Sequence, residues 1–407
     1  MNATPPPADL PCLRPGLSAE PVDDYRRAFS VWDGLRVSRA TLQVPRSLFE
    51  CMMRMNGERT LRDLQAEVMH AHGGLLVPTD ALHELLKYLD EALFLDNARF
   101  RAHLAAPVRE PSCIGCYSGD PAELREQLRG YFTMAGGPGL PGEPKPGGRL
   151  RAALLPHMDY QRGGVTYPWG FKELFERTDA SLFVIVATSH YSSQRFTLTR
   201  QHFNTPLGVV PTDQQYINRL VNHYGDGLFD DPLAHFPEHS VELEVVYLQY
   251  LYENVRPFRI VPLLVGSFRD CVEGSSSPGD RSDIRRMIDA LRAVEEETPG
   301  PICYIISGDL AHIGPKFGDR NPVAEPVLSR SRQRDQAILD RAAAADAAGY
   351  FAAIAAEGDQ RRVCGLPPTY VVLEAAQPSA GRVLHYQQFV HPEGFESVSF
   401  ASMAFDE

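Results

Sequence analysis

The stretch Leu182–Tyr191, with the sequence LFVIVATSHY, decides the fold. Its six opening apolar residues are rich in β-branched types and too few to span a membrane, so they predict a strand buried on both faces. The polar run Thr188-Ser189-His190 follows where this strand ends. Because open α/β sheets place their chemistry at the carboxyl ends of parallel strands, the stretch predicts a site at His190.

Similar patterns occur at three other places in the chain. The segments Leu150–Tyr160 and Ile302–His312 each run from an apolar strand into a histidine and an aspartate, and Pro237–Glu242 places a histidine at the start of a helical pattern. Neutral imidazole is a good ligand for iron, copper and zinc and needs an acceptor group to orient it. These segments therefore predict a metal or acid–base site built from His157, His190, His239 and His312.

From Leu150 onward, buried strands alternate with helical patterns, which predicts a three-layer αβα domain of the α/β class. The strands are expected over 150–155, 182–187, 258–266 and 301–306, with a final pair at 382–390 and 397–405. The helices are expected at about 168–177, 212–223, 239–254, 281–294 and 330–357.

Composition limits the classes of function. A chain of 407 residues exceeds what one core usually supports, so two domains are expected. The net charge of −12 argues against binding to nucleic acid or to an anionic membrane, both of which require basic patches. Seven cysteines spread over the chain, with a single CxxC at Cys113–Cys116, fit reduced thiols and a cytoplasmic protein better than a disulfide framework.

The N-terminal part is expected to form a small separate module. A flexible Pro-rich lead-in over residues 1–23 precedes a winged-helix-like α+β module at 24–96, and a connector at 97–107 joins it to a large domain at 108–407. Within the module we expect a hairpin at Ser30–Val44, with a turn at Asp33-Gly34, and then three helices. The third helix has few cations, which disfavours DNA binding.

This module loosely resembles the PqqD-like domains, which share a strand-rich start and a helical remainder. The resemblance implies that it holds peptide substrates for modifying enzymes. A role in packing or oligomerisation is the alternative, since many small helical modules only bury apolar surface against a neighbour.

The large domain, at about 108–407, resembles the Memo family, known in bacteria as the Memo-like protein B of the AmmeMemoRadiSam system. The matches occur in order along the chain and include the four histidine segments and the dipeptide Cys364-Gly365. The segments that carry the resemblance are Pro156–Tyr160, Thr188–Tyr191, Glu238–Glu242, Val261–Gly266, Ser307–His312 and Ser397–Ala401.

The resemblance implies the fold of the class III extradiol dioxygenases, some of which hold non-haem iron through two histidines and a carboxylate. Carried onto this chain, the family's metal positions fall on His157, His190 and Ala311, and alanine cannot ligate a metal. A site of two histidines needs another ligand, because metal sites generally use three or more protein groups. The candidates for that ligand are Asp159, His239, Asp309 and Cys113.

The function expected from the resemblance is a histidine-lined pocket that holds an iron or copper ion and performs redox or oxygen-dependent chemistry. Its substrate would be a small molecule or a peptide, and its partners would be radical SAM or other AmmeMemoRadiSam-type proteins. The alternative is a non-catalytic scaffold or adaptor that binds a partner through the N-terminal module. The candidate catalytic residues are His239, His312, Asp309 and Tyr160.

Overall fold

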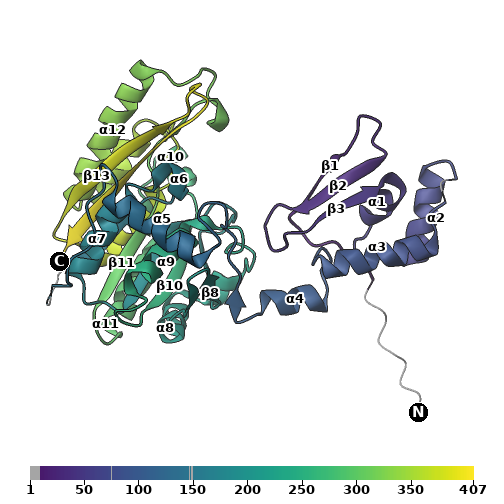
Figure 1. The fold of residues 1–407 in the computed structure, drawn as a ribbon, viewed down its shortest axis with the longest axis horizontal. Helices are drawn as coiled ribbons and strands as arrows, with labels where there is room; N and C mark the ends of the chain where they lie inside the picture. Colours follow the sequence, from purple (N-terminus) through teal and green to yellow (C-terminus); the bar gives the residue numbers. More distant parts are fainter. Residues whose placement is uncertain (1–9, 75, 146, 148–149) are drawn as a thin grey trace, which may run out of the picture. The chain divides into compact units, whose positions relative to one another are not determined.

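The computed structural model describes residues 10–74, 76–145, 147 and 150–407. The chain forms two compact units, Met1–Ala106 and Pro107–Glu407. The boundary between them falls inside the stretch expected as a connector, residues 97–107. Each unit is described on its own below (Figure 1).

The N-terminal unit combines a small antiparallel sheet with helices. Its strands, in the order β1-β2-β3, are β1 (Leu17–Pro21), β2 (Ala28–Asp33) and β3 (Thr41–Pro45). Its helices are α1 (Arg46–Met52), α2 (Leu61–Ala71), α3 (Thr79–Glu91) and α4 (Ala98–Leu104). Thr60 and Asp63 form a capping box at the start of α2, which fixes where this helix begins. The three strands and the first three helices share one core, which includes Val31, Val44, Leu64 and Leu82.

Three details of this unit differ from the sequence expectation. Strand β1 lies in the stretch expected to be a flexible lead-in, of which residues 1–9 lie outside the described part, and α4 lies in the expected connector. A turn does follow Asp33, but the extended piece expected after it does not form, because β2 pairs with β3 across a longer loop. The Asp33 carboxylate organises that loop by accepting the backbone N–H groups of Leu35 and Ser38, both at 2.8 Å.

The C-terminal unit is built on a mixed sheet of eight strands, so the expected α/β class is confirmed. Seven strands follow the order β12-β14-β5-β11-β6-β10-β7, and β13 pairs with β14. The strands β5, β11, β6 and β10 are parallel neighbours, whereas the outer pairings are antiparallel. The strands are β5 (Leu150–Leu155), β6 (Leu182–Thr188), β7 (Phe196–Leu198), β10 (Arg259–Val265), β11 (Ile302–Ser307), β12 (His312–Ile313), β13 (Ala380–Val390) and β14 (Ser397–Asp406).

Helices cover both faces of this sheet. Along β6, Val184 and Val186 face one core while Phe183 and Ile185 face the other, as a strand buried on both faces requires. One face packs against α8 (Gln214–Tyr224), α11 (Ser282–Glu296), α12 (Glu325–Ala343), α13 (Ala347–Ala355) and α14 (Leu366–Ala376). The other packs against α5 (Pro121–Thr133), α7 (Tyr167–Arg177) and α9 (His239–Tyr252).

Smaller elements complete the unit. A second sheet has the order β4-β8-β9, formed by β4 (Val108–Arg109), β8 (His202–Thr205) and β9 (Gly208–Val210). The short helices are α6 (Tyr160–Gly163) and α10 (Arg269–Glu273). Sequence patterns missed this sheet and the buried helix α14, whereas the helices expected at about 330–357 correspond to α12 and α13.

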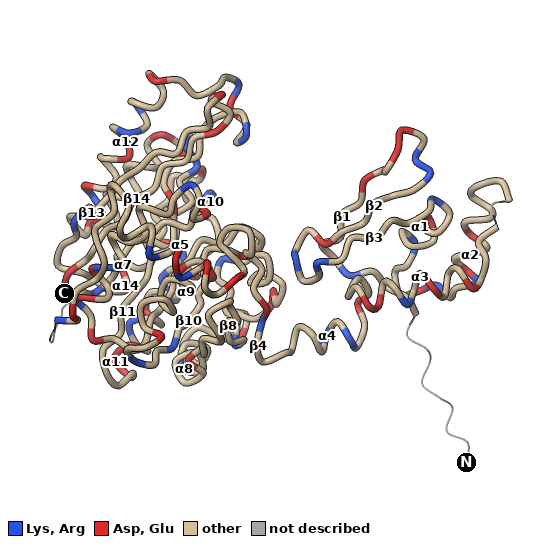
Figure 2. Tube along the Cα trace, viewed as in Figure 1, with Lys and Arg blue, Asp and Glu red and all other residues tan. Residues whose placement is uncertain are grey.

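Charged residues of both signs are distributed along both units (Figure 2). Helix α3 carries one lysine, Lys87, among four acidic residues, Asp80, Glu84, Asp90 and Glu91. In the described part of the chain, no helix has the length and apolar character needed to cross a membrane.

Replacing Asp33 by Asn should lower the free energy of unfolding of the N-terminal unit by about 3 kcal/mol. The Asp33 carboxylate lies 2.7 Å from the Arg14 guanidinium and both side chains are fully buried, so the change leaves a buried cation without its counter-charge. Urea unfolding followed by Trp32 fluorescence in a Trp169→Phe background measures this loss. The exposed Asp24→Asn is the control, and a loss for Asp33→Asn as small as that of the control would contradict the prediction.

Candidate metal centre

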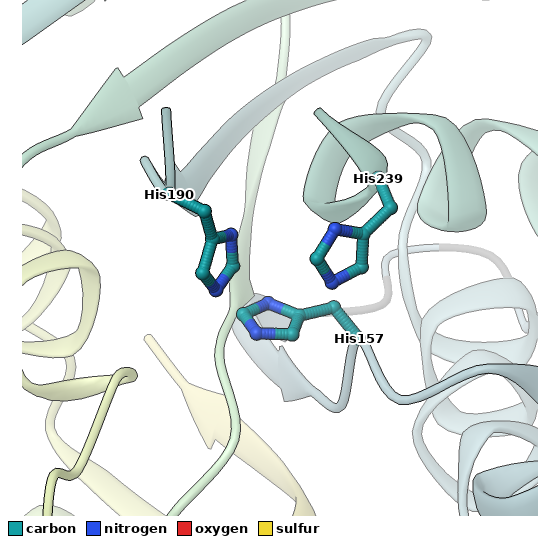
Figure 3. Close-up of side chains that lie close together, drawn as sticks. All are labelled: His157, His190 and His239. Carbon is teal, nitrogen blue, oxygen red and sulfur yellow. The ribbon is translucent and has the colours of Figure 1, made fainter. Parts of the chain in front are cut away.

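Three histidines meet at the carboxyl edge of the parallel strands (Figure 3). His157 follows β5, His190 follows β6, and His239 is the first residue of α9. One ligand nitrogen from each ring lies within 4.8 Å of the other two. The ring centroids are 5.0 Å apart for His157 and His190, 5.2 Å for His157 and His239, and 4.8 Å for His190 and His239.

His190 is oriented by the buried carboxylate of Glu238. The Nδ1 atom of His190 lies 2.9 Å from Glu238 Oε1, and the backbone N–H of His190 donates to Oε2 at 2.7 Å. Nδ1 therefore carries the proton, and Nε2 presents its lone pair to the other two rings. Burial alone would lower the pKa of His190, but the charge and hydrogen bond of Glu238 outweigh it and raise that pKa. Burial likewise opposes ionisation of Glu238, yet His190 holds the pKa of this carboxyl at about 2.

His157 is oriented by Ser307, at the end of β11. The Ser307 hydroxyl donates to the Ser240 carbonyl oxygen at 2.6 Å, so its oxygen is left to accept from His157 Nδ1, at 3.3 Å. This arrangement places the proton of His157 on Nδ1 and leaves Nε2 free to ligate. Burial lowers the pKa of His157 far below its ordinary value, and the neighbouring histidines lower it further. The ring is therefore neutral, as a metal ligand must be.

Asp309 supports His157 from the next strand end. Its Oδ1 accepts the backbone N–H of His157 at 3.1 Å, and its Oδ2 lies 3.8 Å from His157 Nε2. Burial raises the pKa of Asp309 to about 7. Asp309 is thus beside the three histidines rather than one of the three clustered ligands.

A cysteine thiol also lies at this centre. Cys364 Sγ is 3.2 Å from His157 Nε2, and the Cys364 carbonyl accepts the Thr188 hydroxyl at 2.8 Å. Cys364 is half-buried, and the removal of water from around its thiol raises the pKa of that thiol well above the ordinary value. No strand or helical pattern in the sequence indicates that Cys364 lies at this centre. The signal that could have indicated it is the dipeptide Cys364-Gly365, which is one of the matches to the family.

Close contact between two glycines brings Cys364 to this position. A Cβ atom on Gly308 would lie 2.5 Å from Gly365 Cα, and a Cβ on Gly365 would lie 2.7 Å from the Asp309 carbonyl oxygen. The end of β11 and the loop before α14 can therefore approach this closely only without side chains at both positions.

Ala311, the position expected for the family's third ligand, belongs instead to the sheet. Its N–H donates to Ser399 Oγ at 3.0 Å, and its carbonyl accepts the backbone N–H of Ser399 at 3.0 Å. Among the candidates named for the third ligand, the structure brings His239 to the other two histidines.

Two other candidates for the third ligand have partners elsewhere. The Asp159 carboxylate caps α6, accepting the backbone N–H of Arg162, and forms an ion pair with the Arg162 side chain. Cys113 is buried, and its backbone N–H donates to Glu242 Oε1 at 2.9 Å. These contacts hold Asp159 and Cys113 in the surrounding fold, and neither residue belongs to the histidine cluster.

The remaining candidate catalytic residues lie in different surroundings. His312 is in β12, and its Nδ1 lies 3.1 Å and 3.0 Å from the carbonyl oxygens of Leu310 and Arg362. Its Nδ1 therefore carries the proton, and burial lowers its pKa to about 4. The Tyr160 hydroxyl is fully buried and donates to the Leu243 carbonyl at 2.5 Å, so it is bonded to the backbone of α9.

Comparison with known proteins places this centre in a family. Residues 109–404 match the family described as Memo-like protein. A MEMO1 family protein of Aquifex aeolicus is 25% identical over 406 residues, covering 97% of this chain and 100% of the relative, so the similarity includes the N-terminal unit. MEMO1 family proteins of Methanopyrus kandleri and Thermus thermophilus are 29% and 27% identical, over 68% and 81% of this chain and 91% and 94% of their own lengths. The family match over residues 109–404, which is most of the chain, shows that this chain belongs to the Memo-like protein family.

Proposed function

We propose that this protein binds a transition-metal ion, iron or copper, through His157, His190 and His239. In this proposal the ion serves redox or oxygen-dependent chemistry on a small molecule or a peptide. The observation that carries it is the convergence of three imidazole nitrogens within 4.8 Å of one another. The fold alone would not support a metal-dependent function, because one fold hosts many functions.

The residues present fit such an ion in their chemistry. Imidazole suits iron, copper and zinc, and ligating histidines usually donate their other N–H to an oxygen acceptor. His190 has Glu238 in that role and His157 has Ser307. The Cys364 thiol beside His157 adds a soft donor, which favours copper or iron over calcium or magnesium. A bound iron or copper ion would supply one-electron chemistry.

His312 is the residue that we propose as a proton acceptor for the substrate. Its Nδ1 proton is bonded to backbone carbonyls, so Nε2 presents a lone pair, and its lowered pKa keeps the ring neutral near pH 7. Asp309, whose pKa is about 7, can hold or give up a proton in the same range. The proposal gives Tyr160 no role in substrate binding, because its hydroxyl is bonded to Leu243.

The wider setting of this function is also a proposal. Family membership supports a cytoplasmic protein with the class III extradiol dioxygenase fold, and radical SAM or other AmmeMemoRadiSam-type proteins as its partners. A winged-helix-like or PqqD-like N-terminal unit would hold the peptide. The similarity to the Aquifex aeolicus relative over that relative's full length supports a shared role for this unit.

Replacing His157, His190 or His239 singly by Ala should reduce the bound metal from about one equivalent per chain to about a tenth or less, because each change removes one of three nitrogen ligands. Elemental analysis of protein purified anaerobically without chelator measures the content. His312→Ala is the matched control and should keep its metal while losing turnover. Wild-type protein that stays below about a tenth of an equivalent after anaerobic reconstitution would refute the metal function.

Replacing Glu238 by Gln should weaken metal binding about 10- to 100-fold, because the neutral amide lacks the charge that holds the His190 proton on Nδ1, and its NH₂ group cannot accept the N–H donors that the carboxylate accepts. Competition with a chromogenic chelator gives the affinity. Glu253→Gln, at the far end of α9, is the control and should bind as wild type does. Equal affinities for the two variants would mean that Glu238 does not orient the ligand.

A further inference from the structure

Helix α9 carries a buried carboxyl group, Glu244, to which the proposed function gives no role. Its side chain is 0% exposed, and neither carboxyl oxygen has a hydrogen-bond partner among the described residues. An ionised carboxylate in such a place costs several kcal/mol unless it is paired, so the group is held neutral. Burial accordingly raises the pKa of Glu244 well above its ordinary value, and the nearby Ser307 side chain offsets this only in part.

Glu242, two residues earlier on α9, shows what a paired carboxylate looks like in this core. It lies 2.7 Å from the Arg109 guanidinium and accepts the backbone N–H groups of Ser112 and Cys113, each at 2.9 Å. Glu244 has no such arrangement. The difference is local, because both side chains leave the same buried helix.

In the part of the chain that the structure describes, the groups that act on Glu244 include no cation. Within the described residues, Glu244 interacts with Ser307 and Asp309, from the end of β11, and electrostatically with three tyrosines. The tyrosine hydroxyls donate to backbone carbonyls and so cannot stabilise a carboxylate: Tyr160 to Leu243, Tyr167 to Met158, and Tyr247 to Gly164. No described side chain therefore supplies a positive charge next to Glu244, and a bound ion would bring one.

A cation bound at the histidine cluster would bring such a charge. Ser307, the polar neighbour of Glu244, bonds both to His157 Nδ1 and to the Ser240 carbonyl, one helical turn before Glu244. One serine thus separates Glu244 from a ligand ring. A divalent cation held by these three imidazoles favours ionisation of nearby acids, since bound metal ions are often the largest local charges.

We propose that Glu244 is the charge-compensating acid of this centre: it is neutral in the cation-free protein and releases its proton to solvent when a divalent cation binds at His157, His190 and His239. The inference rests on the metal function proposed above. Glu244 does not contact the ion in this proposal. It has a positioning role, which it exerts through its electrostatic field and through Ser307.

The test counts protons. Calorimetric titration of the full chain with Zn²⁺ as a redox-silent probe, in buffers of different ionisation enthalpy, gives the protons released per ion. Wild type should release about one proton more than Glu244→Gln, and the pH dependence of its binding constant should be steeper by about one unit of log K per pH unit. Protons displaced from the histidines are common to both proteins and cancel in this comparison.

Glu253→Gln, on the exposed end of the same helix, is the matched control and should release as many protons as wild type. Equal proton counts for wild type and Glu244→Gln, with both binding Zn²⁺, overturn the inference and leave the metal function standing. Failure of wild type to bind Zn²⁺, iron or copper refutes the metal function and the inference with it. If Glu244→Gln does not fold, infrared spectra of wild type at about pH 9 decide, because Asp309, with a pKa of about 7, is ionised there and the remaining protonated carboxyl band should disappear when Zn²⁺ is added.

The cation-free protein offers an independent check through its stability. The folded state keeps the Glu244 proton above the acid's ordinary pKa while the unfolded chain loses it, so this group makes wild type less stable as pH rises. Glu244→Gln lacks that penalty. The difference between its melting temperature and that of wild type should therefore increase as the pH rises from about 5 to about 8. A constant difference across this range would show that Glu244 is not protonated in the folded protein.

Discussion

The centre depends on the carboxylate of Glu238. This one group accepts four hydrogen bonds: from Nδ1 and the backbone N–H of His190, and from the backbone N–H groups of His239 and Ser240. It therefore caps helix α9, fixes the end of strand β6 and orients an imidazole at the same time. A buried carboxylate is costly unless its oxygens are satisfied, and here Oε1 has three donors and Oε2 has one. The positions of His190 and His239 are consequently set by one buried charge.

The strand order provides the rest of the arrangement. Because β11 lies between β5 and β6 and is parallel to both, three strand ends from distant parts of the chain open at one edge. His157, Ser307 and His190 follow from this order alone. The helix α9 then supplies the third ring from outside the sheet, so the pattern of strand ends finds two of the three clustered histidines, and the other histidine that it predicts, His312, lies outside the cluster.

Much of the fold and of the candidate metal centre could be predicted from the sequence. The apolar runs of β5, β6 and β11 are short, continuous and followed by polar residues, so both the α/β class and the location of His157 and His190 could be inferred. His239 was only one of four options for a third ligand, because local sequence cannot tell which side chain a helix start turns towards a distant strand. Cys364 was missed because its position depends on a contact between Gly308 and Gly365, which are 57 positions apart in the sequence. The loop at Asp33 was mispredicted because its long-range partner, Arg14, is invisible to turn patterns.

The contact between Gly308 and Gly365 also closes a long excursion of the chain. The polypeptide leaves the centre at the end of β11, forms α12 and α13, and returns to within contact distance of its starting point before α14. Both ends of this excursion are fixed independently of what lies between them. Loop-closure entropy grows only slowly with length, and exposed loop tips tolerate insertion. The exposed stretch Arg320–Pro322 is thus a natural place to graft a reporter domain, since added chain there is accommodated by the excursion and should leave the geometry of the three histidines unchanged.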